Sequence, residues 1–189
     1  MTKTGVIAVL LASALVYGCA PRAAAPDPAS RSVQARMRGV AEYGEGNYQR
    51  AIGRFTEALR IDRATDDRKS EALDLVDIGR VYIAVNDAKS ARGFLAEAVR
   101  LSKTEGLAEV LSEAYATLAK AELMEGDNPS ALRYIDESIA TDATLSKKEP
   151  GGKLNLKAAV FLSDNRVAEA VSVFERALSV SDAIGDDSE

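Results

Sequence analysis

The sequence has no histidine, no tryptophan and a single cysteine among its 189 residues. Without histidine it cannot build a Ser-His-Asp triad, a Cys-His pair or an imidazole metal site. One cysteine can form neither an internal disulfide nor a thiolate zinc site, so we expect no cofactor and no metal. Lys and Arg number 24 against 29 Asp and Glu, an acidic balance that argues against a nucleic-acid partner. Aromatic residues make up only 5%, which favours tightly packed helices over a sandwich of strands.

An apolar leader opens the chain. Lys3 supplies a positive charge, and residues 5–17 form an almost unbroken apolar run of 13 residues. A membrane-spanning helix needs roughly 20 apolar residues, so the shorter run predicts a secretory signal peptide over residues 1–18. The alternatives are a short transmembrane anchor and a buried helix.

The leader ends in Val16-Tyr17-Gly18-Cys19, which resembles the lipobox of bacterial lipoproteins. The resemblance implies cleavage before Cys19 and acylation of that residue, and it accounts for the unpaired cysteine. Tyr17 departs from the family pattern, which has a smaller residue there. Several acyl chains anchor a protein firmly, whereas one chain binds only marginally. Ala20 is not the aspartate that retains such lipoproteins in the inner membrane, so the expected location is the bacterial outer membrane, facing the periplasm.

Residues 19–32 are predicted to be the lipidated Cys19 followed by a tether rich in Pro and Ala. The segment holds three of the five prolines and no large apolar side chain. It has nothing to bury and is expected to be semi-extended.

The rest of the chain is an internal repeat. Four alanines, which we call the key alanines, recur in equivalent contexts at nearly equal intervals: Ala51, Ala91, Ala131 and Ala170. Twelve residues before each stands a small residue: Gly39, Gly79, Ala119 and Ala158. Four residues after each stands a bulky one: Phe55, Leu95, Ile135 and Phe174. Counted from each alanine, apolar positions at i, i+4, i+7 and i+8 predict one helix face, so small residues let paired helices approach and bulky ones fill the space to the next repeat.

This pattern resembles the tetratricopeptide repeat (TPR). The resemblance runs from Val33 to Asp182, and it implies an all-α fold, a right-handed α-solenoid of about four helix pairs. Its repeats would span residues 33–68, 69–108, 109–148 and 149–182, before an acidic tail at 183–189. The interval from Ala51 to Ala91 exceeds the family period of about 34 residues, which predicts longer helices or longer connections. The closing proline of the family is replaced by Arg63, Lys103, Ala143 and Asp182.

Asn, Gly and Asp residues between the predicted helices are expected to end one helix and cap the next. Asn128-Pro129 predicts an N-cap followed by a first-turn proline. Pro150-Gly151-Gly152 interrupts the chain between the third and fourth repeats, and we interpret it as a turn. The alternative, a phosphate loop that uses Lys153, lacks the earlier glycine and the preceding strand of a Walker motif.

In TPR folds the first helix of each repeat lines a concave groove, which gives candidate partner-binding positions. The resemblance implies an apolar ladder with basic residues beside it. The ladder is Tyr43, Ile83, Leu123 and Leu162, and the basic residues are Arg36, Arg80 and Lys120. Such a groove would take an extended or helical protein segment that carries acidic residues. The alternative is that the ladder is partly core and the basic residues are simply solvated.

The C-terminal repeat is a second candidate surface. Only residues 181–189 follow its apolar positions, too few for the polar capping helix that terminal repeats need. Either the last helix is unusually amphipathic, or its apolar side meets a partner or a second copy of the chain, and a second copy would give a homo-oligomer.

The leading functional hypothesis is a non-catalytic, membrane-anchored scaffold lipoprotein that binds a protein partner in the periplasm. Its sharpest form is a pilotin-like factor for an envelope, pilus or secretion complex. The alternative is a self-associating structural envelope lipoprotein whose array ends stack head to tail. An enzyme is the third hypothesis, with acid–base chemistry at two carboxylate pairs near helix ends, where acids are usually solvated. The pairs are Glu42 with Glu45 and Glu122 with Glu125.

Overall fold

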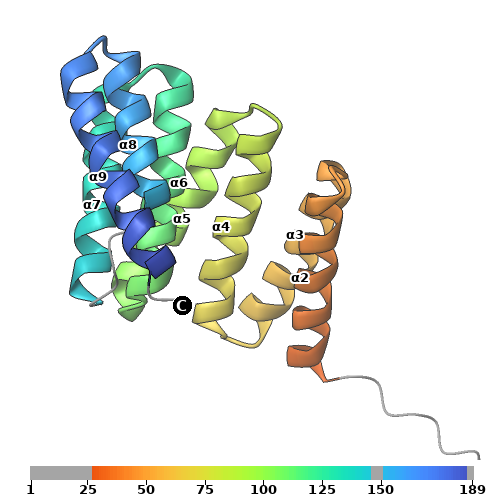
Figure 1. Ribbon diagram of the computed structural model, residues 1–189. Helices are drawn as coiled ribbons and strands as arrows, with labels where there is room; N and C mark the ends of the chain where they lie inside the picture. The colour runs from red at the N-terminus through yellow and green to blue at the C-terminus, as the bar shows by residue number, and fades with distance from the viewer. Residues whose placement is uncertain (1–26, 146–150, 187–189) are drawn as a thin grey trace, which may run out of the picture.

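The computed structural model of the chain describes residues 27–145 and 151–186, with side chains described as far as residue 180. These ranges form eight α-helices joined by turns and contain no strand (Figure 1). The helices are α2 (Pro28–Gly44), α3 (Tyr48–Ala64), α4 (Arg68–Ala84), α5 (Ala88–Glu105), α6 (Ala108–Glu125), α7 (Asn128–Thr144), α8 (Gly151–Ser163) and α9 (Val167–Asp186). The expected signal peptide, Cys19 and most of the expected tether lie outside the described residues.

The wide spacing of the key alanines comes from long helices joined by short turns. Helices α2, α3, α4 and α7 have 17 residues each, and α5 and α6 have 18. A left-handed residue recurs in successive turns at a constant interval, at Gly46, Asp66, Asn86, Gly106 and Gly126. Glycine adopts this conformation without cost, and Asn and Asp tolerate it better than other residues. One helix with its turn therefore occupies the interval between two successive left-handed residues. A helix pair occupies two such intervals, and this length equals the spacing of the key alanines.

Four helices begin with the same Asp-x-x-Ser cap, in which the aspartate side chain accepts a hydrogen bond from the serine N–H. The pairs are Asp27 with Ser30, Asp67 with Ser70, Asp87 with Ser90 and Asp127 with Ser130. The prediction that Asn128 caps α7 is therefore wrong by one residue: Asp127 is the N-cap, and Asn128 is the first helical residue. An aspartate oxygen so placed satisfies an N–H that has no partner within the helix.

Three predicted boundaries differ from the structure. Helix α2 begins at Pro28, capped by Asp27, so residues 28–32 are helical and do not belong to an extended tether. Proline is well placed there, because the first turn of a helix needs no N–H from it. Gly151 and Gly152, interpreted as part of a turn, form the first turn of α8. Helix α9 continues to Asp186, into the stretch expected to be a tail from residue 183.

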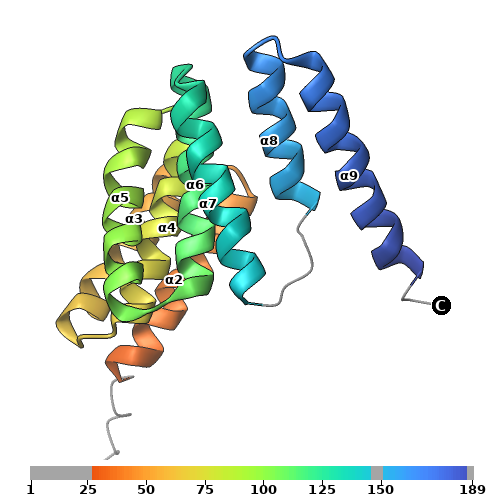
Figure 2. The same ribbon diagram turned by 90° about the vertical axis from the view of Figure 1, so that its left-hand side faces the viewer.

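The helices pack as consecutive antiparallel pairs in two layers. We call α2, α4, α6 and α8 the inner helices and α3, α5, α7 and α9 the outer helices. Helix α4 contacts α6 and α6 contacts α8, whereas successive outer helices are not in comparable contact, so the array curves toward the inner helices. Figure 2 shows α8 and α9 as a pair at one end of the stack, and α2 and α3 form the other end in Figure 1.

Small residues on the inner helices receive bulky side chains from the outer helices, as the repeat pattern predicts. A Cβ atom added to Gly39 would lie 2.7 Å from Phe55, and one added to Gly79 would lie 2.6 Å from Leu95. Both bulky side chains are buried. The fourth repeat differs, because Phe174 is 38% exposed, and no described helix follows α9 to cover it.

Candidate functional site

The four predicted ladder residues lie in the last turns of the four inner helices. Tyr43, Ile83 and Leu162 are each the penultimate residue of their helix, and Leu123 is two residues from the end of α6. Tyr43 and Leu162 are exposed, whereas Ile83 and Leu123 are half-buried. The four ladder residues therefore lie at the same end of the inner layer. Ile83 also packs against the cluster that contains Leu95, so part of the ladder contributes to the core.

Arg36, predicted to be a groove residue, is the centre of a buried ion cluster. Its guanidinium donates from Nε to Asp74 at 2.6 Å and from Nη2 to Asp62 at 2.7 Å. Asp62 lies on α3 and Asp74 on α4, so Arg36 joins the first repeat to the second. With its Nε and Nη2 donors engaged by two carboxylates and its side chain only 19% exposed, Arg36 is not an open basic residue for a partner.

The Arg36 cluster holds two carboxylates and one cation. Asp74 is fully buried, and burial raises its pKa to about 7, although Arg36 acts in the opposite direction. Its second oxygen, Oδ2, has no hydrogen-bond partner among the described residues. One cation cannot neutralise two buried carboxylates, so the folded cluster favours taking up a proton.

Of the other two predicted basic residues, Lys120 is the more accessible. Arg80 pairs with Asp77 at 3.1 Å and with Glu113 at 2.7 Å. Since Glu113 lies on α6, Arg80 links two inner helices. Lys120 is exposed on α6, and it forms no ion pair with any residue in the described ranges. The inner helices therefore carry charges of both signs, and Lys120 is an available cation among the predicted groove residues.

One carboxylate of each pair in the enzyme hypothesis forms an ion pair with an arginine of a neighbouring helix. Glu122 is buried, against the expectation that it is solvated, and it pairs with Arg92 on α5 at 3.2 Å. Burial raises the pKa of Glu122, and Arg92 offsets part of that rise. Glu42 pairs with Arg50 at 3.1 Å. These contacts join neighbouring helices, and they do not direct two carboxylates at a common cavity.

Lys153, considered as a phosphate ligand, forms a second buried ion cluster. Its Nζ donates to Asp142 on α7 at 2.6 Å and also to the hydroxyl of Ser112 on α6. Asp142 in turn accepts from the Ser112 hydroxyl at 2.7 Å. The ammonium group thus joins the fourth repeat to the third and is not available to a phosphate. Sequence analysis missed this role of Lys153.

The outer face of α9 carries an exposed apolar stripe. Its residues follow the helical spacing i, i+4, i+7 and i+11. They are Val167, Val171, Phe174 and Leu178, between 38% and 63% exposed. This stripe is the unpaired apolar side that the sequence predicts for the last repeat.

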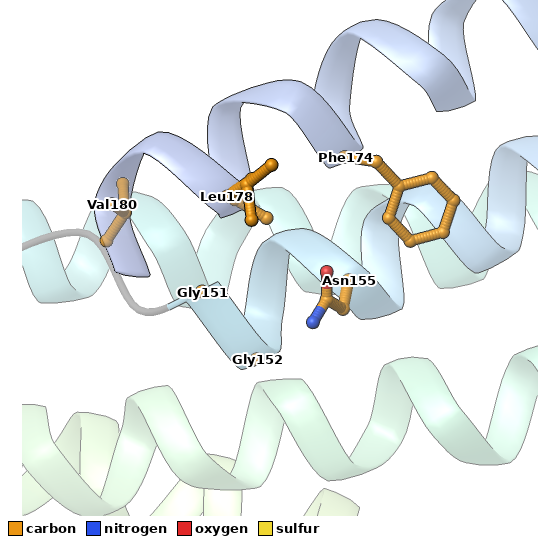
Figure 3. A pocket seen from close by; sticks show the side chains of 7 residues that line it. Gly151, Gly152, Asn155, Phe174, Leu178 and Val180 are labelled. Atoms are coloured by element: carbon orange, nitrogen blue, oxygen red, sulfur yellow. The ribbon is translucent and has the colours of Figure 1, made fainter. Parts of the chain in front are cut away.

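A hollow of about 610 Å³ lies beside this stripe, between the start of α8 and the second half of α9. Figure 3 shows Leu178 and Val180 on α9 on the side of Gly151 and Gly152 of α8, and Phe174 closer to Asn155. The two glycines present no side chains, and α8 has 13 residues where α2, α4 and α6 have 17 or 18. The short inner helix leaves the end of α9 partly uncovered.

Two further properties concern only the described ranges. No helix there combines the length and the apolar character required to cross a membrane. No group of three or more carboxylate or thiol side chains within them is arranged to hold a metal ion.

No family model matches the sequence, and no curated protein matches it at a significant level. Solved structures do resemble the fold. BtubC from P. vanneervenii has a TM-score of 0.73 at 14% identity, over 86% of this chain and 67% of that one. TPR-like repeats of a kinesin light chain from Podosopora anserina have a TM-score of 0.69 at 17% identity, over 84% and 78%.

The Rap conjugation gene regulator of plasmid pLS20, solved in complex with the Phr* peptide, has a TM-score of 0.76 at 14% identity. The likeness covers 87% of this chain and 45% of the regulator, so the chain spans less than half the length of that protein. At such identities the comparisons concern the fold alone. Together with the eight described helices, they confirm the prediction of an all-α, TPR-like helical-repeat solenoid.

Proposed function

We propose that the chain is a lipid-anchored, non-catalytic scaffold that binds a segment of another protein along its inner face. The observation that carries this proposal is the exposure of Tyr43 and Leu162 at the same end of the inner layer, with half-buried Ile83 and Leu123 between them. Exposed apolar residues that gather on one surface are typical of an interaction surface. The Rap regulator provides an example of a similar fold solved with a peptide.

The partner segment should combine apolar residues with at least one acidic residue. The apolar residues would lie on the ladder, and the acidic residue would face Lys120, the predicted groove cation that has no ion-pair partner in the described ranges. A helix or an extended segment satisfies this requirement. Asp77 and Glu113 already neutralise Arg80, so Arg80 contributes less.

The anchor and the location belong to the same proposal and are supported by the sequence. The lipobox-like Val16–Cys19 supports acylation at Cys19, and Ala20 supports the outer membrane, facing the periplasm. A pilotin-like role in assembling an envelope, pilus or secretion complex would use both features. Mass spectrometry of the mature N-terminus tests the anchor: an acylated Cys19 is expected, and an unmodified chain that begins elsewhere would contradict it.

Site-specific photo-crosslinking of the whole chain in its host tests the inner face. A crosslinker at Leu162 should capture one protein repeatedly, and Lys120→Glu should reduce its yield several-fold, because the acidic residue of the partner would meet a like charge. Lys89→Glu is the matched control, since Lys89 is also an exposed lysine but lies on outer helix α5. Equal yields from both variants would contradict the proposed groove.

A further inference from the structure

The apolar face of α9 is the surface that an interior outer helix buries. Counted from the key alanine of each repeat, its four exposed residues match four residues of α3. They are Val167, Val171, Phe174 and Leu178, which match Tyr48, Ile52, Phe55 and Leu59. The α3 residues belong to, or pack against, the cluster that joins α3 to α4. The α9 face therefore has the pattern of a surface that receives an inner helix.

Helix α2, at the other end of the array, is an inner helix that no described outer helix precedes. Its Met37 is 67% exposed and lies two residues before Gly39, as Leu156 lies two residues before Ala158. Leu156 packs against the cluster that contains Ile135 on α7. The counterpart of Ile135 on α9 is the exposed Phe174. A helix α2 placed after α9 would therefore bring Met37 to Phe174.

The charged residues at the two ends of the array correspond in position to an ion pair at a junction inside the array. Between α7 and α8, Asp136 pairs with Lys157 at 2.7 Å. Asp136 stands five residues after Ala131, and Glu175 stands five residues after Ala170. Lys157 directly precedes Ala158, and Arg38 directly precedes Gly39.

Glu175 and Arg38 are both exposed, and neither forms an ion pair within the described part of the chain. The two ends thus carry opposite charges at the positions where an interior junction has an ion pair. Such complementarity gives a contact its register and selects the partner.

We propose that a second copy of the chain covers the α9 face, with α2 of that copy in the place of the next inner helix. The contact is head to tail, so each copy uses a different surface at each end. It buries the α9 stripe against α2 and pairs Glu175 with Arg38 of the neighbouring copy. Repetition of this contact extends the solenoid from copy to copy. This proposal is independent of partner binding on the inner face.

Charge reversal in the whole chain tests the contact. Two forms of the chain with different epitope tags are coexpressed, solubilised in detergent and copurified. Glu175→Arg in both forms should lower copurification roughly two- to fivefold, and Arg38→Glu in both forms should do the same, because exposed ion pairs contribute modestly. One form with Glu175→Arg and one with Arg38→Glu should restore it, since both head-to-tail contacts between the two different forms then pair opposite charges.

A second variant tests the apolar part of the contact. Leu178→Asp should lower copurification more than roughly tenfold, because it places a charge within the apolar stripe that the contact buries. Leu162→Asp is the control: Leu162 is also an exposed leucine, but it lies on the inner face, so copurification should stay unchanged while partner capture falls.

Three results would overturn the proposal. The first is an equal loss of copurification with Leu178→Asp and Leu162→Asp. The second is a loss of copurification with Glu175→Arg but none with Arg38→Glu. The third is that mixing the Glu175→Arg form with the Arg38→Glu form does not restore copurification. The second result would indicate a symmetric contact between two α9 helices, which leaves α2 outside the interface. Circular dichroism of each variant checks that its helices are intact.

Discussion

The two halves of the array bury a charged cluster at the same position in different ways. Asp62 in the first repeat and Asp142 in the third each stand eleven residues after the key alanine, and both are buried. Arg36, from within the first repeat, neutralises Asp62 and also holds Asp74. Lys153, from the fourth repeat, neutralises Asp142. One cluster therefore joins two buried carboxylates to one cation, whereas the other balances one buried carboxylate with one cation and has the half-exposed Glu113 at 3.7 Å from Lys153.

The junction between the second and third repeats shows that the position eleven residues after the key alanine does not need a charged residue. Ser102 stands where Asp62 and Asp142 stand in the other repeats, and it is fully buried. The core around that junction is apolar, with Leu101 and Val110 in one cluster. Buried ion pairs are weak evidence for stability, since apolar replacements are often as stable, but removal of one partner is costly. The clusters are thus points where single substitutions have large effects.

The largest expected effect is at Lys153. Lys153→Met should lower the free energy of unfolding by about 3–5 kcal/mol, because it leaves Asp142 buried without its cation. Urea denaturation measures the loss, and the fourth repeat should unfold before the rest. Lys157→Met is the matched control: its partner Asp136 is 55% exposed, so the cost should be at most about 1 kcal/mol. Equal losses in the free energy of unfolding would show that Lys153 contributes no more to stability than Lys157.

A smaller effect on stability is expected at the small residues of the inner helices, which differ between the two halves of the array. The first two repeats place glycine against the bulky side chain, at Gly39 and Gly79, and the last two place alanine. A Cβ at Gly79 would lie 2.6 Å from Leu95, so Gly79→Ala should cost about 1–3 kcal/mol by overpacking.

Gly93→Ala is the control for that substitution. A Cβ at Gly93 meets nothing within 4 Å, and alanine in a helix interior is favoured over glycine by about 0.5–1 kcal/mol. Thermal unfolding should therefore move in opposite directions for the two variants. A gain in stability from both would mean that Leu95 moves aside without cost, and the contrast between the halves would then have no energetic meaning.

The sequence predicts the helix pairs well because their signals are local. Small and bulky residues at fixed distances from Ala51 and its counterparts identify which faces meet. Glycines that recur at Gly46, Gly106 and Gly126 mark the turns, and these positions have positive φ. The Asp-x-x-Ser pattern at Asp27 was also readable, and it would have placed the start of α2 correctly.

The ion clusters could not be predicted in the same way. Arg36 and Asp74 are 38 residues apart in the sequence, and whether a polar residue on an amphipathic helix faces a neighbour or the solvent depends on how the pairs stack. Arg36 therefore resembled Lys120 in the sequence, although one is at the centre of a cluster and the other is exposed. Single-sequence periodicity defines faces, whereas the partners of charged side chains depend on tertiary placement.

The smallest expected effect is a change in pH dependence at Asp74. Burial raises the pKa of Asp74 to about 7, from an ordinary value near 3.8. Between these values the folded state binds more protons than the unfolded state, so the contribution of Asp74 to stability is lost as pH rises from about 4 to about 7.

Asp74→Asn removes the titrating group and leaves Arg36 to pair with Asp62. The melting temperature of the variant, relative to that of the original chain, should therefore be higher at pH 8 than at pH 5. Asp66→Asn provides the control, since Asp66 is exposed in a turn with positive φ that asparagine also tolerates, and it should leave the pH dependence unchanged. A parallel pH dependence for Asp74→Asn and the original chain would mean that Arg36 keeps both carboxylates ionised, and the two clusters would then differ in composition but not in protonation.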